Sequence, residues 1–357
     1  MGDGSGLSWI GRVLVLLQLV TGILGWGKDG HYAVCKIAEG YLTEDALAAV
    51  KELLPDSAEG DLAAVCSWPD EVRFHYRWSS ALHYIDTPDF KCNYQYCRDC
   101  HDSAGHKDRC VTGAIFNYTK QLTSAYQNSN SEFKYNLTEA LMFLAHFIGD
   151  VHQPLHVGFT GDLGGNTITV RWYRRKTNLH HVWDDMIIDS ALKTFYGSDL
   201  ANMIRAIQNN MTEGWSNQLP LWEYCQNNCT VCPDPYASES ISLACKFAYK
   251  NATPGSTLGG DCVKDLCVAG AIQNFTSQLL HYREGRNYRS QMYAVESINL
   301  GCKWGYKGVN EGPTLADDYF NSRMPIVMKR IAQGGVRLAM FLNQISGDSE
   351  EVIASAT

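Results

Sequence analysis

The stretch HFIGDVHQPLHVG at residues 146–158 constrains the fold of this chain more than any other feature. It follows the apolar run ALMFLA, and apolar side chains at helical spacing across residues 137–152 predict a buried helix. A protein core does not admit several titratable side chains unless partners neutralise them. The sequence therefore predicts a core helix with one polar edge that is held by ligands.

The residue types and spacing along this polar edge predict that it binds metal ions. His146 and Asp150 are four residues apart, so on a helix they share a face and can bind one ion together. Pro154 should end the helix and let His156 serve a second ion. A lone histidine would more often be a satisfied core residue, but three histidines and an aspartate within residues 146–156 favour metal. His152 lies on a different face, so we expect it to pack rather than bind.

The segment NLHHVWDD at residues 178–185 offers a second pair of ligands. His180 and Asp184 are four residues apart, and His181 and Asp185 form the register-shifted alternative. Only one of the two pairs can face a metal site. Upstream, Asp70 in CSWPDEVR and the histidine at position 83 in SSALHYIDTPD are further candidates that would be unremarkable alone.

The first residues carry a secretion signal. Arg12 precedes the apolar run VLVLLQLVTGILG, which has the length of a signal-peptide core, and no later stretch could span a bilayer. Cleavage after Gly25 would make Trp26 the new N-terminus. A free α-amine has a pKa near ~8 and can chelate a metal together with its own carbonyl oxygen. His31 lies near enough in sequence to join it; the alternative is that Trp26 is simply the first core residue.

Helical spacing dominates the remainder of the chain and predicts a mainly α fold with at most a small β element. The best strand candidate is NTITVRWY at residues 166–173. Helices are predicted in the segments AVCKIAEGYL, EDALAAVKELL, LTEALMFLAHFIGDVH, DMIIDSALKTFY and MPIVMKRIAQGGVRLAMFLNQI.

The cysteine content indicates the cellular compartment, and the net charge limits how the protein could hold a polyanionic substrate. In a secreted chain the 13 cysteines indicate disulfides first, and a zinc ribbon at Cys97/Cys100 or Cys229/Cys232 only second. The net charge of −8 means that a polyanionic substrate would have to be held locally, by metal and a few cations. Glycosylation sequons fit the same compartment and occur at Asn117, Asn136, Asn210, Asn228, Asn251 and Asn274.

An internal repeat is copied out of order. Residues 107–122 return at 264–279, and residues 237–250 return at 294–307. A solenoid would repeat at one fixed period, so that architecture is excluded. Residues 259–315 could be removed to leave a continuous domain, which indicates either a fusion of tandem gene copies or a true insertion. Ten cysteines precede this segment and three lie within it, which favours the fusion.

Taken together and in this order, the motifs resemble those of the S1/P1 nuclease family. They are Trp26 with His31, WPD ending at Asp70, LHYIDTPD, HFIGDVHQPLHVG and NLHHVWD. The cysteine-rich, glycosylated setting is similar to that of the plant bifunctional endonucleases. The resemblance covers about residues 26–258 and 316–345 and leaves 259–315 unexplained.

This resemblance implies a single-domain helical bundle of the zinc phospholipase C/P1 nuclease type that holds three Zn²⁺ ions. The first ion would be bound by Asp70, His83, His146 and Asp150. Asp150 would bridge to a second ion, held by the Trp26 amine and carbonyl and by His31, and the third would be held by His156, His180 and Asp184. One disulfide is expected between Cys35 and Cys66.

The resemblance also implies a secreted endonuclease that hydrolyses single-stranded DNA and RNA to 5′-phosphate products and acts on 3′-nucleotides. Asp70 and Arg73 would be catalytic, and Tyr84 and Asp86 would bind the base. No membrane partner is expected after signal removal. The protein would be extracellular or vacuolar, with a C-terminal helix at 316–345 and a disordered tail at 346–357.

Two other functions stay open at this point. A zinc phospholipase of the related fold would share the metal ligands but would need an apolar rim for acyl chains. A secreted zinc-binding protein that is inactivated by residues 259–315 is the second alternative. Nothing in the sequence bears on oligomeric state.

Overall fold

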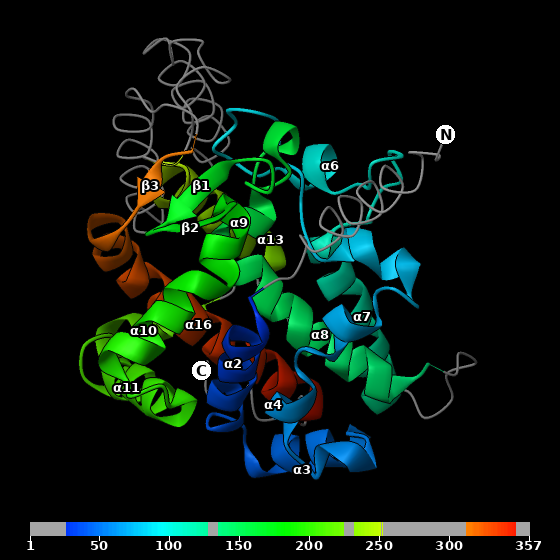
Figure 1. The fold of residues 1–357 in the computed structure, drawn as a ribbon. Coiled ribbons are helices and arrows are strands. Elements are labelled where there is room, and N and C mark those ends of the chain that lie inside the picture. Colours follow the sequence, from blue (N-terminus) through cyan, green and yellow to red (C-terminus); the bar gives the residue numbers. More distant parts are fainter. Residues whose placement is uncertain (1–25, 128–134, 225–231, 251, 253–311, 348–357) are drawn as a thin grey trace, which may run out of the picture.

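The computed structural model describes residues 26–127, 135–224, 232–250, 252 and 312–347 (Figure 1). The predicted signal peptide, almost all of 259–315 and the tail from residue 348 lie outside the described residues, as do the sequons at Asn228, Asn251 and Asn274. The three described sequon asparagines, Asn117, Asn136 and Asn210, are exposed.

The described chain is a bundle of helices with one small sheet at its edge (Figure 1). The mainly α prediction is confirmed. The α-helices are α2 (Lys28–Glu39), α3 (Glu44–Leu53), α4 (Leu62–Val65), α5 (Trp68–Val72), α6 (Tyr96–Asp99), α7 (Val111–Gln127), α8 (Leu137–His152), α9 (Leu179–His181), α10 (Ile187–Phe195), α11 (Leu200–Thr212), α12 (Leu219–Glu223), α13 (Pro233–Leu243) and α16 (Asp317–Ser346). Short 3₁₀-helices are η1 (Asp56–Ala58), η2 (Arg77–Leu82), η3 (Pro154–Val157), η4 (Thr160–Asp162) and η6 (Ser216–Gln218), and η5 (Val182–Met186) and η8 (Ala244–Ala248) are π-helical.

Helix α8 occupies the centre of the bundle. The Asn136 side chain caps its first turn by accepting a hydrogen bond from the Glu139 backbone N–H at 3.2 Å. Every residue from Ala140 to His152 is buried, and α2, α5, α7, α13 and α16 pack around it. The helix ends at His152 and Pro154 opens η3, as predicted from the proline.

The C-terminal helix α16 packs across α2 and α8 (Figure 1). Two buried arginines of this helix, Arg330 and Arg337, both donate to the Glu239 carboxylate on α13 at 2.7 Å. Arg337 also lies 2.9 Å from His152 Nε2 at the end of α8. None of the described helices is both long and apolar enough to cross a lipid bilayer.

The sheet has the order β2-β1-β3. Strands β1 (Thr169–Trp172) and β2 (Arg175–Asn178) pair antiparallel, with Thr169 opposite Asn178 and Trp172 opposite Arg175. The predicted strand at 166–173 thus contains β1. Strand β3 (Thr314–Leu315) pairs with β1 in parallel, so the last two residues of the segment 259–315 belong to the described domain.

Disulfides join distant parts of the bundle. Cys35 pairs with Cys66, Cys92 with Cys245, and Cys100 with Cys110, and Cys232 is also disulfide-bonded. The alternative of a zinc ribbon is therefore wrong, because Cys100 and Cys232 have no free thiol. Among the described cysteines only Cys97 is free.

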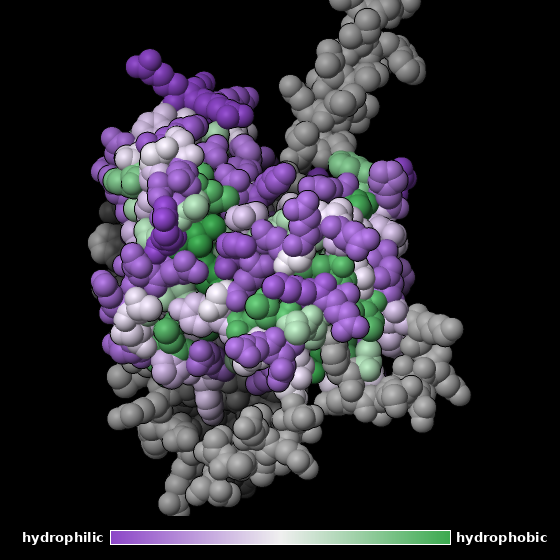
Figure 2. Space-filling model, turned by 90° about the horizontal axis from the view of Figure 1, so that it is seen from below, coloured by the Kyte–Doolittle hydropathy of each residue, from purple (hydrophilic) through white to green (hydrophobic). Residues whose placement is uncertain are grey.

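The surface seen from below in Figure 2 carries small hydrophobic areas between hydrophilic ones, as is usual for a globular domain.

Candidate metal centre

Asp150 is the hub of a buried cluster of histidines. Its Oδ2 lies 3.0 Å from His83 Nδ1 and 3.2 Å from His146 Nε2. Its Oδ1 lies 3.4 Å from His31 Nε2 and 3.4 Å from His156 Nδ1. These side chains come from α2, α8, η3 and the turn after η2, so one carboxylate gathers ligands from four parts of the chain.

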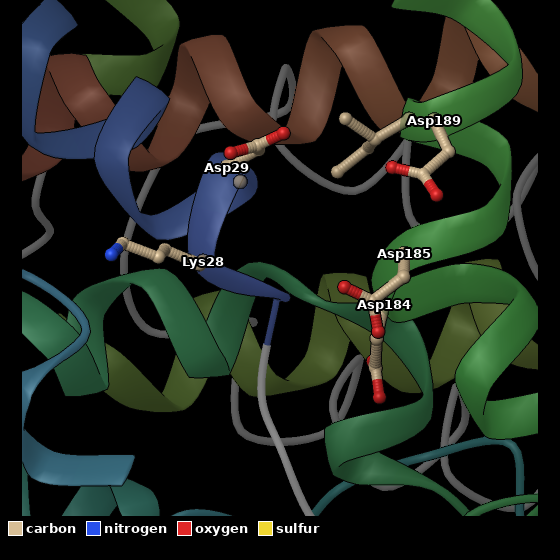
Figure 3. A pocket seen from close by; sticks show the side chains of 7 residues that line it. Lys28, Asp29, Asp184, Asp185 and Asp189 are labelled. Atoms are coloured by element: carbon tan, nitrogen blue, oxygen red, sulfur yellow. The ribbon is translucent and has the colours of Figure 1, made fainter. Parts of the chain in front are cut away.

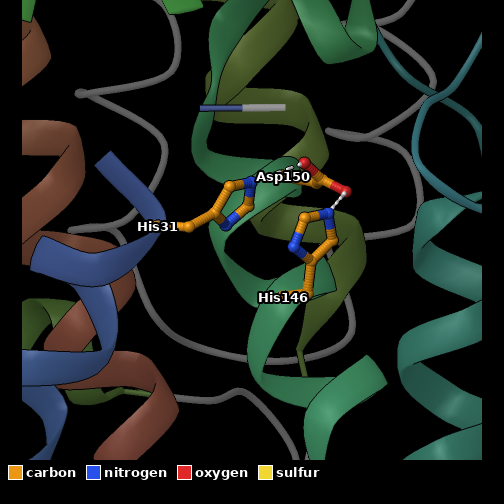
Figure 4. Close-up of side chains that lie close together, drawn as sticks. All are labelled: His31, His146 and Asp150. Atoms are coloured by element: carbon orange, nitrogen blue, oxygen red, sulfur yellow. Dashed lines mark ion pairs between the residues drawn. The ribbon is translucent and has the colours of Figure 1, made fainter. Parts of the chain in front are cut away.

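Three groups of side chains each bring ligand atoms within 4.8 Å of one another, and all their members are buried. Figure 4 shows the first, in which the His31 and His146 rings stack with their centroids 3.8 Å apart beside Asp150. These groups are His31, His146 and Asp150; Asp70, His83 and His146; and His156, His180 and Asp184. The structure thus brings together all eight side chains that the sequence suggested as ligands.

Backbone carbonyls fix the orientation of three of these histidines. Nδ1 of His146 lies 2.8 Å from the Cys66 carbonyl oxygen, and Nδ1 of His180 lies 2.7 Å from that of Gly164. Nδ1 of His156 lies 2.7 Å from the carbonyl oxygen of His83. A carbonyl accepts a hydrogen bond from a ring N–H, which leaves Nε2 as the unprotonated nitrogen that a metal binds.

The cluster contains buried polar atoms that the described residues leave without hydrogen-bond partners. Both ring nitrogens of His31, Oδ1 of Asp70 and Oδ1 of Asp150 are in this state. Burying such atoms unpaired is costly, and a cation between them removes the cost. The donor set of five histidine nitrogens and three carboxylates suits zinc. The residues therefore fit the metal that the resemblance implies.

The histidines and carboxylates of the cluster shift one another's pKa values strongly. Burial alone would lower the pKa of His146, but the Asp150 and Asp70 carboxylates outweigh it and raise that pKa to about 9. Burial, reinforced by His146, lowers the pKa of His31 to about 4. Burial would raise the pKa of Asp150, but the surrounding histidines, His146 first, hold it well below its usual range. Asp150 is therefore an anion in the core, as the predicted role of a metal ligand requires.

A π-helical turn selects the register of the third group. His180 ends up 3.3 Å from Asp184 between Nε2 and Oδ2, and both are buried. The alternative pair, His181 and Asp185, makes an ion pair of 2.9 Å but is 39% and 29% exposed and belongs to none of the three buried groups. The predicted helix over 185–196 accordingly starts late, at Ile187, because η5 precedes it. π-bulges are frequent at functional sites.

Trp26 lies beside the first group. It is fully buried, and a side chain on Gly30 would collide with its Cβ, at 2.7 Å. Close packing also explains Gly149 on α8, where a Cβ would lie 2.7 Å from His31 Nδ1. The backbone N–H of Gly27 donates to the Asp184 carbonyl at 3.0 Å. The start of the predicted mature chain is thus tied to the segment that holds the third group.

Tyr84 and Asp86, the predicted base-binding residues, share one side of an extended segment beside the cluster. Backbone N–H groups of Ile85 and Thr87 donate to the His156 and Gly158 carbonyls at 2.7 and 2.9 Å. Ile85 is buried, whereas Tyr84 and Asp86 are half-buried. Burial raises the pKa of Asp86 to about 6, an effect that nearby His101 opposes.

Arg73 follows α5, three residues after Asp70. Its side chain is largely buried, and its guanidinium lies 5.3 Å from the centroid of the exposed Phe74 ring. Within the described residues it forms no ion pair.

A pocket of ≈ 160 Å³ lies beside the third group (Figure 3). The carboxylates of Asp29, Asp185 and Asp189 line it together with Lys28. Burial, and then Asp189 and Asp185, raises the pKa of Asp29. This acidic lining repels phosphate, so the pocket does not suit an anionic substrate.

Gln153 contributes to the centre although it was not among the predicted site residues. Gln153 donates from Nε2 to the Asp184 carboxylate, and its side-chain oxygen accepts from the Leu155 backbone. Its position within the ligand-rich stretch was the available signal. His152, predicted to pack, contacts no ligand group: its Nδ1 lies 2.6 Å from the Ile148 carbonyl, and Arg337 donates to its Nε2.

Known proteins match this chain over most of its length. The family model for S1/P1 nuclease matches residues 26–265 and 284–347. The chain is similar to Endonuclease 4 of Arabidopsis thaliana, at 59% identity over 94% of each chain. It is also similar to Endonuclease 5 of the same plant, at 53% identity over 94% of this chain and 96% of the relative. Nuclease PA3 of Penicillium sp is 34% identical over 90% of this chain and 98% of its own length.

Proposed function

The chain belongs to the S1/P1 nuclease family and is a hydrolytic nuclease, and on this basis we propose that it is a zinc-dependent endonuclease specific for single strands. It would hydrolyse phosphodiester bonds of DNA and RNA to 5′-phosphate products and also act on 3′-nucleotides.

The observation that carries this proposal is the set of three buried ligand groups arranged around Asp150. His31, Asp70, His83, His146 and Asp150 would hold two zinc ions with the Trp26 amine and carbonyl, and His156, His180 and Asp184 would hold the third. When bound, zinc supplies a water acidified from a pKa of about 15.7 towards neutrality and offsets charge on the phosphate. Asp150 belongs to the first group and lies 3.0 Å from His83 of the second, so it would serve both of these ions.

Asp70 and Arg73 would act on the phosphate side of the centre. Asp70 presents Oδ1 at 3.7 Å from both His83 Nδ1 and His146 Nε2, so the three side chains could share one ion. Arg73 would bind a phosphate oxygen, since a guanidinium donates two parallel hydrogen bonds to such a group. It would thereby stabilise the charge that develops at phosphorus.

Tyr84 and Asp86 would select a single strand. A base must be splayed out of a duplex before a ring can stack on one face and a carboxylate can read its edge. The shared side of Tyr84 and Asp86, next to the ligand His83, suits that arrangement. Stacking and metal binding together also explain how a chain with a net charge of −8 could hold a polyanion.

The proposal includes the path to the mature protein. Residues 1–25 would be removed on entry to the secretory pathway, and disulfides in the described residues agree with that compartment. The destination would be extracellular or vacuolar. The nuclease domain would comprise 26–258 completed by 316–345, with 259–315 as a partial duplication or insertion and a disordered tail.

The test combines N-terminal sequencing, zinc quantitation and parallel assays on the secreted protein. We expect a chain that starts at Trp26, binds about three zinc ions and hydrolyses single-stranded DNA and a 3′-nucleotide, with loss of activity in EDTA. Hydrolysis of phosphatidylcholine alone would favour the phospholipase. Zinc without any hydrolysis would favour an inactive metal-binding protein.

A deletion tests the role of residues 259–315. Gly-Ser-Thr-Leu at 255–258 resembles Gly-Pro-Thr-Leu at 312–315, so the deletion restores an equivalent sequence before Ala316. We expect the shortened chain to keep its zinc and its activity. Loss of folding would indicate a true insertion on which the domain depends, and a marked gain of activity would indicate that the segment inhibits the site. Peptide mapping of the natural protein should also show whether residues 262–293 are translated.

A further inference from the structure

The proposed ligand His180 is oriented by a turn with an uncommon backbone. Its Nδ1 lies 2.7 Å from the carbonyl oxygen of Gly164. Leu163, Gly164 and Gly165 all lie in the left-handed region, at φ 52°, 62° and 87°. A Cβ on Gly164 would lie 2.4 Å from a backbone carbonyl oxygen. We call residues 162–165 the glycine turn, and its shape has to be held by contacts with the rest of the fold.

Asp162 and Tyr249 provide such contacts. Oδ1 of Asp162 accepts a hydrogen bond from the Gly165 backbone N–H at 2.7 Å and another from the Tyr249 hydroxyl at 3.0 Å. The same hydroxyl accepts a hydrogen bond from the Phe159 backbone N–H at 3.0 Å. Tyr249 is fully buried, and its ring stacks on that of Phe159 with the centroids 4.7 Å apart. One buried hydroxyl thus connects the residues on both sides of the glycine turn.

The segment that carries Tyr249 is linked to the third group a second time. Tyr249 follows η8, and the carbonyl of the preceding Ala248 accepts a hydrogen bond from the Tyr319 hydroxyl of α16 at 2.6 Å. That hydroxyl in turn accepts from Trp183 Nε1 at 2.9 Å. Trp183 directly precedes the proposed ligand Asp184. Two consecutive residues at the end of η8 are therefore connected to the two elements that carry His180 and Asp184.

A second buried tyrosine in the same part of the chain makes no such link. Tyr236 on α13 is as deeply buried as Tyr249, but its hydroxyl has no hydrogen-bond partner among the described residues. Its ring lies 4.0 Å from the Arg337 guanidinium. Tyr249 and Tyr236 are thus a matched pair of buried tyrosines, and only the hydroxyl of Tyr249 leads to a proposed ligand.

We infer that Tyr249 is a positioning residue for the metal position formed by His156, His180 and Asp184, and that it acts through Asp162 and the glycine turn. The hydroxyl fixes the turn, and the turn presents the Gly164 carbonyl that orients the His180 ring. In this orientation His180 Nε2 lies 3.3 Å from Asp184 Oδ2. Groups that orient a metal ligand in this way typically contribute about 10- to 100-fold to metal affinity. The inference rests on the proposed zinc centre.

The first test removes one oxygen atom. Tyr249→Phe keeps the ring but deprives Asp162 of a donor and leaves the Phe159 backbone N–H without its acceptor. In chelator titrations of the zinc-loaded protein, one of about three zinc equivalents should bind about 10-fold or more weakly. The other two should keep their affinity. Tyr236→Phe is the matched control and should change none of them. Released zinc is measured with a metal indicator, so this readout needs no turnover.

A second background distinguishes positioning from a general loss of packing. His180→Ala should already lack the third ion, so adding Tyr249→Phe should leave the affinity for the two remaining ions unchanged. A hydroxyl that merely stabilises the fold would affect those two ions in this background as well.

Variants of Asp162 test the path between the hydroxyl and the ligand. Asp162→Ala should reproduce the weakened equivalent, and Asp162→Ala/Tyr249→Phe should be no weaker than Asp162→Ala alone, because both changes interrupt one path. Asp162→Asn keeps an oxygen that can accept both hydrogen bonds, so it should retain most of the affinity. Circular dichroism shows whether each variant is folded, and if Tyr249→Phe does not fold, the two Asp162 variants decide the question.

Several outcomes would overturn the inference. They are unchanged zinc affinity in Tyr249→Phe, equal weakening of all the zinc equivalents, and equal effects of Tyr249→Phe and Tyr236→Phe. An unaltered protein that binds no zinc would overturn it together with the proposed function. An unaltered protein that binds zinc but hydrolyses no nucleic acid would refute the proposed function alone, because the titrations would still decide the role of Tyr249.

Discussion

His146 Nδ1 lies 2.8 Å from the carbonyl oxygen of Cys66, and Cys66 is disulfide-bonded to Cys35. Cys35 is four residues after His31 on α2, one helical turn away. One covalent bond therefore joins the helix that carries His31 to the carbonyl that orients His146. The stacked pair of imidazoles depends on this link as well as on packing.

Removing that disulfide should weaken both folding and metal binding. The bond spans a separation of 31 residues, and loop-closure entropy predicts that Cys35→Ala/Cys66→Ala lowers the free energy of unfolding by about 3–4 kcal/mol. Zinc should also be lost at lower EDTA concentration, because the His146 ring is less firmly oriented. Cys100→Ala/Cys110→Ala is the control: it should reduce stability but leave zinc retention unchanged. Equal zinc loss in both variants would contradict the link to His146.

Adjacent histidines should differ sharply in their effect on the third group. His180→Ala removes a buried side chain that we propose as a zinc ligand, so zinc content should fall from about three to about two, and kcat/KM by at least about 100-fold. His181→Ala should change neither by more than about twofold, because its partner Asp185 lies outside the ligand groups. Zinc analysis and steady-state kinetics on both variants provide the check. The reverse pattern would mean that the register-shifted pair is the real one.

Base binding should weaken as pH falls through about 6. Burial raises the pKa of Asp86 to about 6, so below that pH the carboxylate gains a proton and no longer accepts hydrogen bonds from a base as an anion. KM for a 3′-nucleotide should then rise by up to about tenfold per pH unit. Asp86→Asn should have a higher KM above pH 6 and a flat profile across it.

Two controls accompany that experiment. Asp45→Asn, an exposed change on α3, should retain the pH dependence of the unaltered protein. Zinc content is measured at each pH, because protonation of the proposed histidine ligands would also reduce activity.

The free energy of unfolding provides an independent test of the Asp86 pKa. Because this pKa is raised in the folded protein, ionisation of Asp86 destabilises the fold, and the free energy of unfolding should decrease as pH rises from about 4 to 6. Asp86→Asn should abolish that decline.

The Glu239 carboxylate neutralises two buried arginines, so its removal should destabilise the bundle. Arg330 and Arg337 both bond to it, and Arg337 in turn donates to His152 at the end of α8. Glu239→Gln removes the anion that faces the two cations. Because the Glu239 side chain is 40% exposed, the loss should be about 1–3 kcal/mol of unfolding free energy at neutral pH, less than for a fully buried pair. Chemical denaturation provides the measurement, and the exposed Glu213→Gln should stay within about 0.5 kcal/mol.

The loss of stability in Glu239→Gln should depend on pH, because the pKa of the Glu239 carboxyl is lowered in the folded protein. Burial would raise the pKa of Glu239, but Arg337 and Arg330 outweigh it and lower the pKa to about 2. The stabilisation is therefore complete above the unfolded value near 4.5 and disappears as pH falls towards about 2. The difference between Glu239→Gln and the unaltered protein should shrink over that range. A difference that stayed constant would mean that lost packing, rather than charge, causes the effect.

Local sequence was sufficient for the elements with strong periodicity. Helix α8 covers the predicted residues 137–152 and ends at the proline, because continuous apolar spacing and a ring that blocks the helix are both local properties. The β1 strand was likewise visible as an alternating run. The π-helical turn η5 was not, since a single inserted residue leaves the apolar pattern almost unchanged.

The sequence by itself determined which side chains could serve as ligands, because residue type and the spacing of four along a helix limit what one ion can reach. Only the tertiary structure decided between His180 with Asp184 and His181 with Asp185, since the two pairs have identical spacing and differ only in which one is buried. It also decided that Asp150 meets four histidines from separate segments. Contacts between residues far apart in the chain depend on how the helices pack, and local patterns carry no record of that packing.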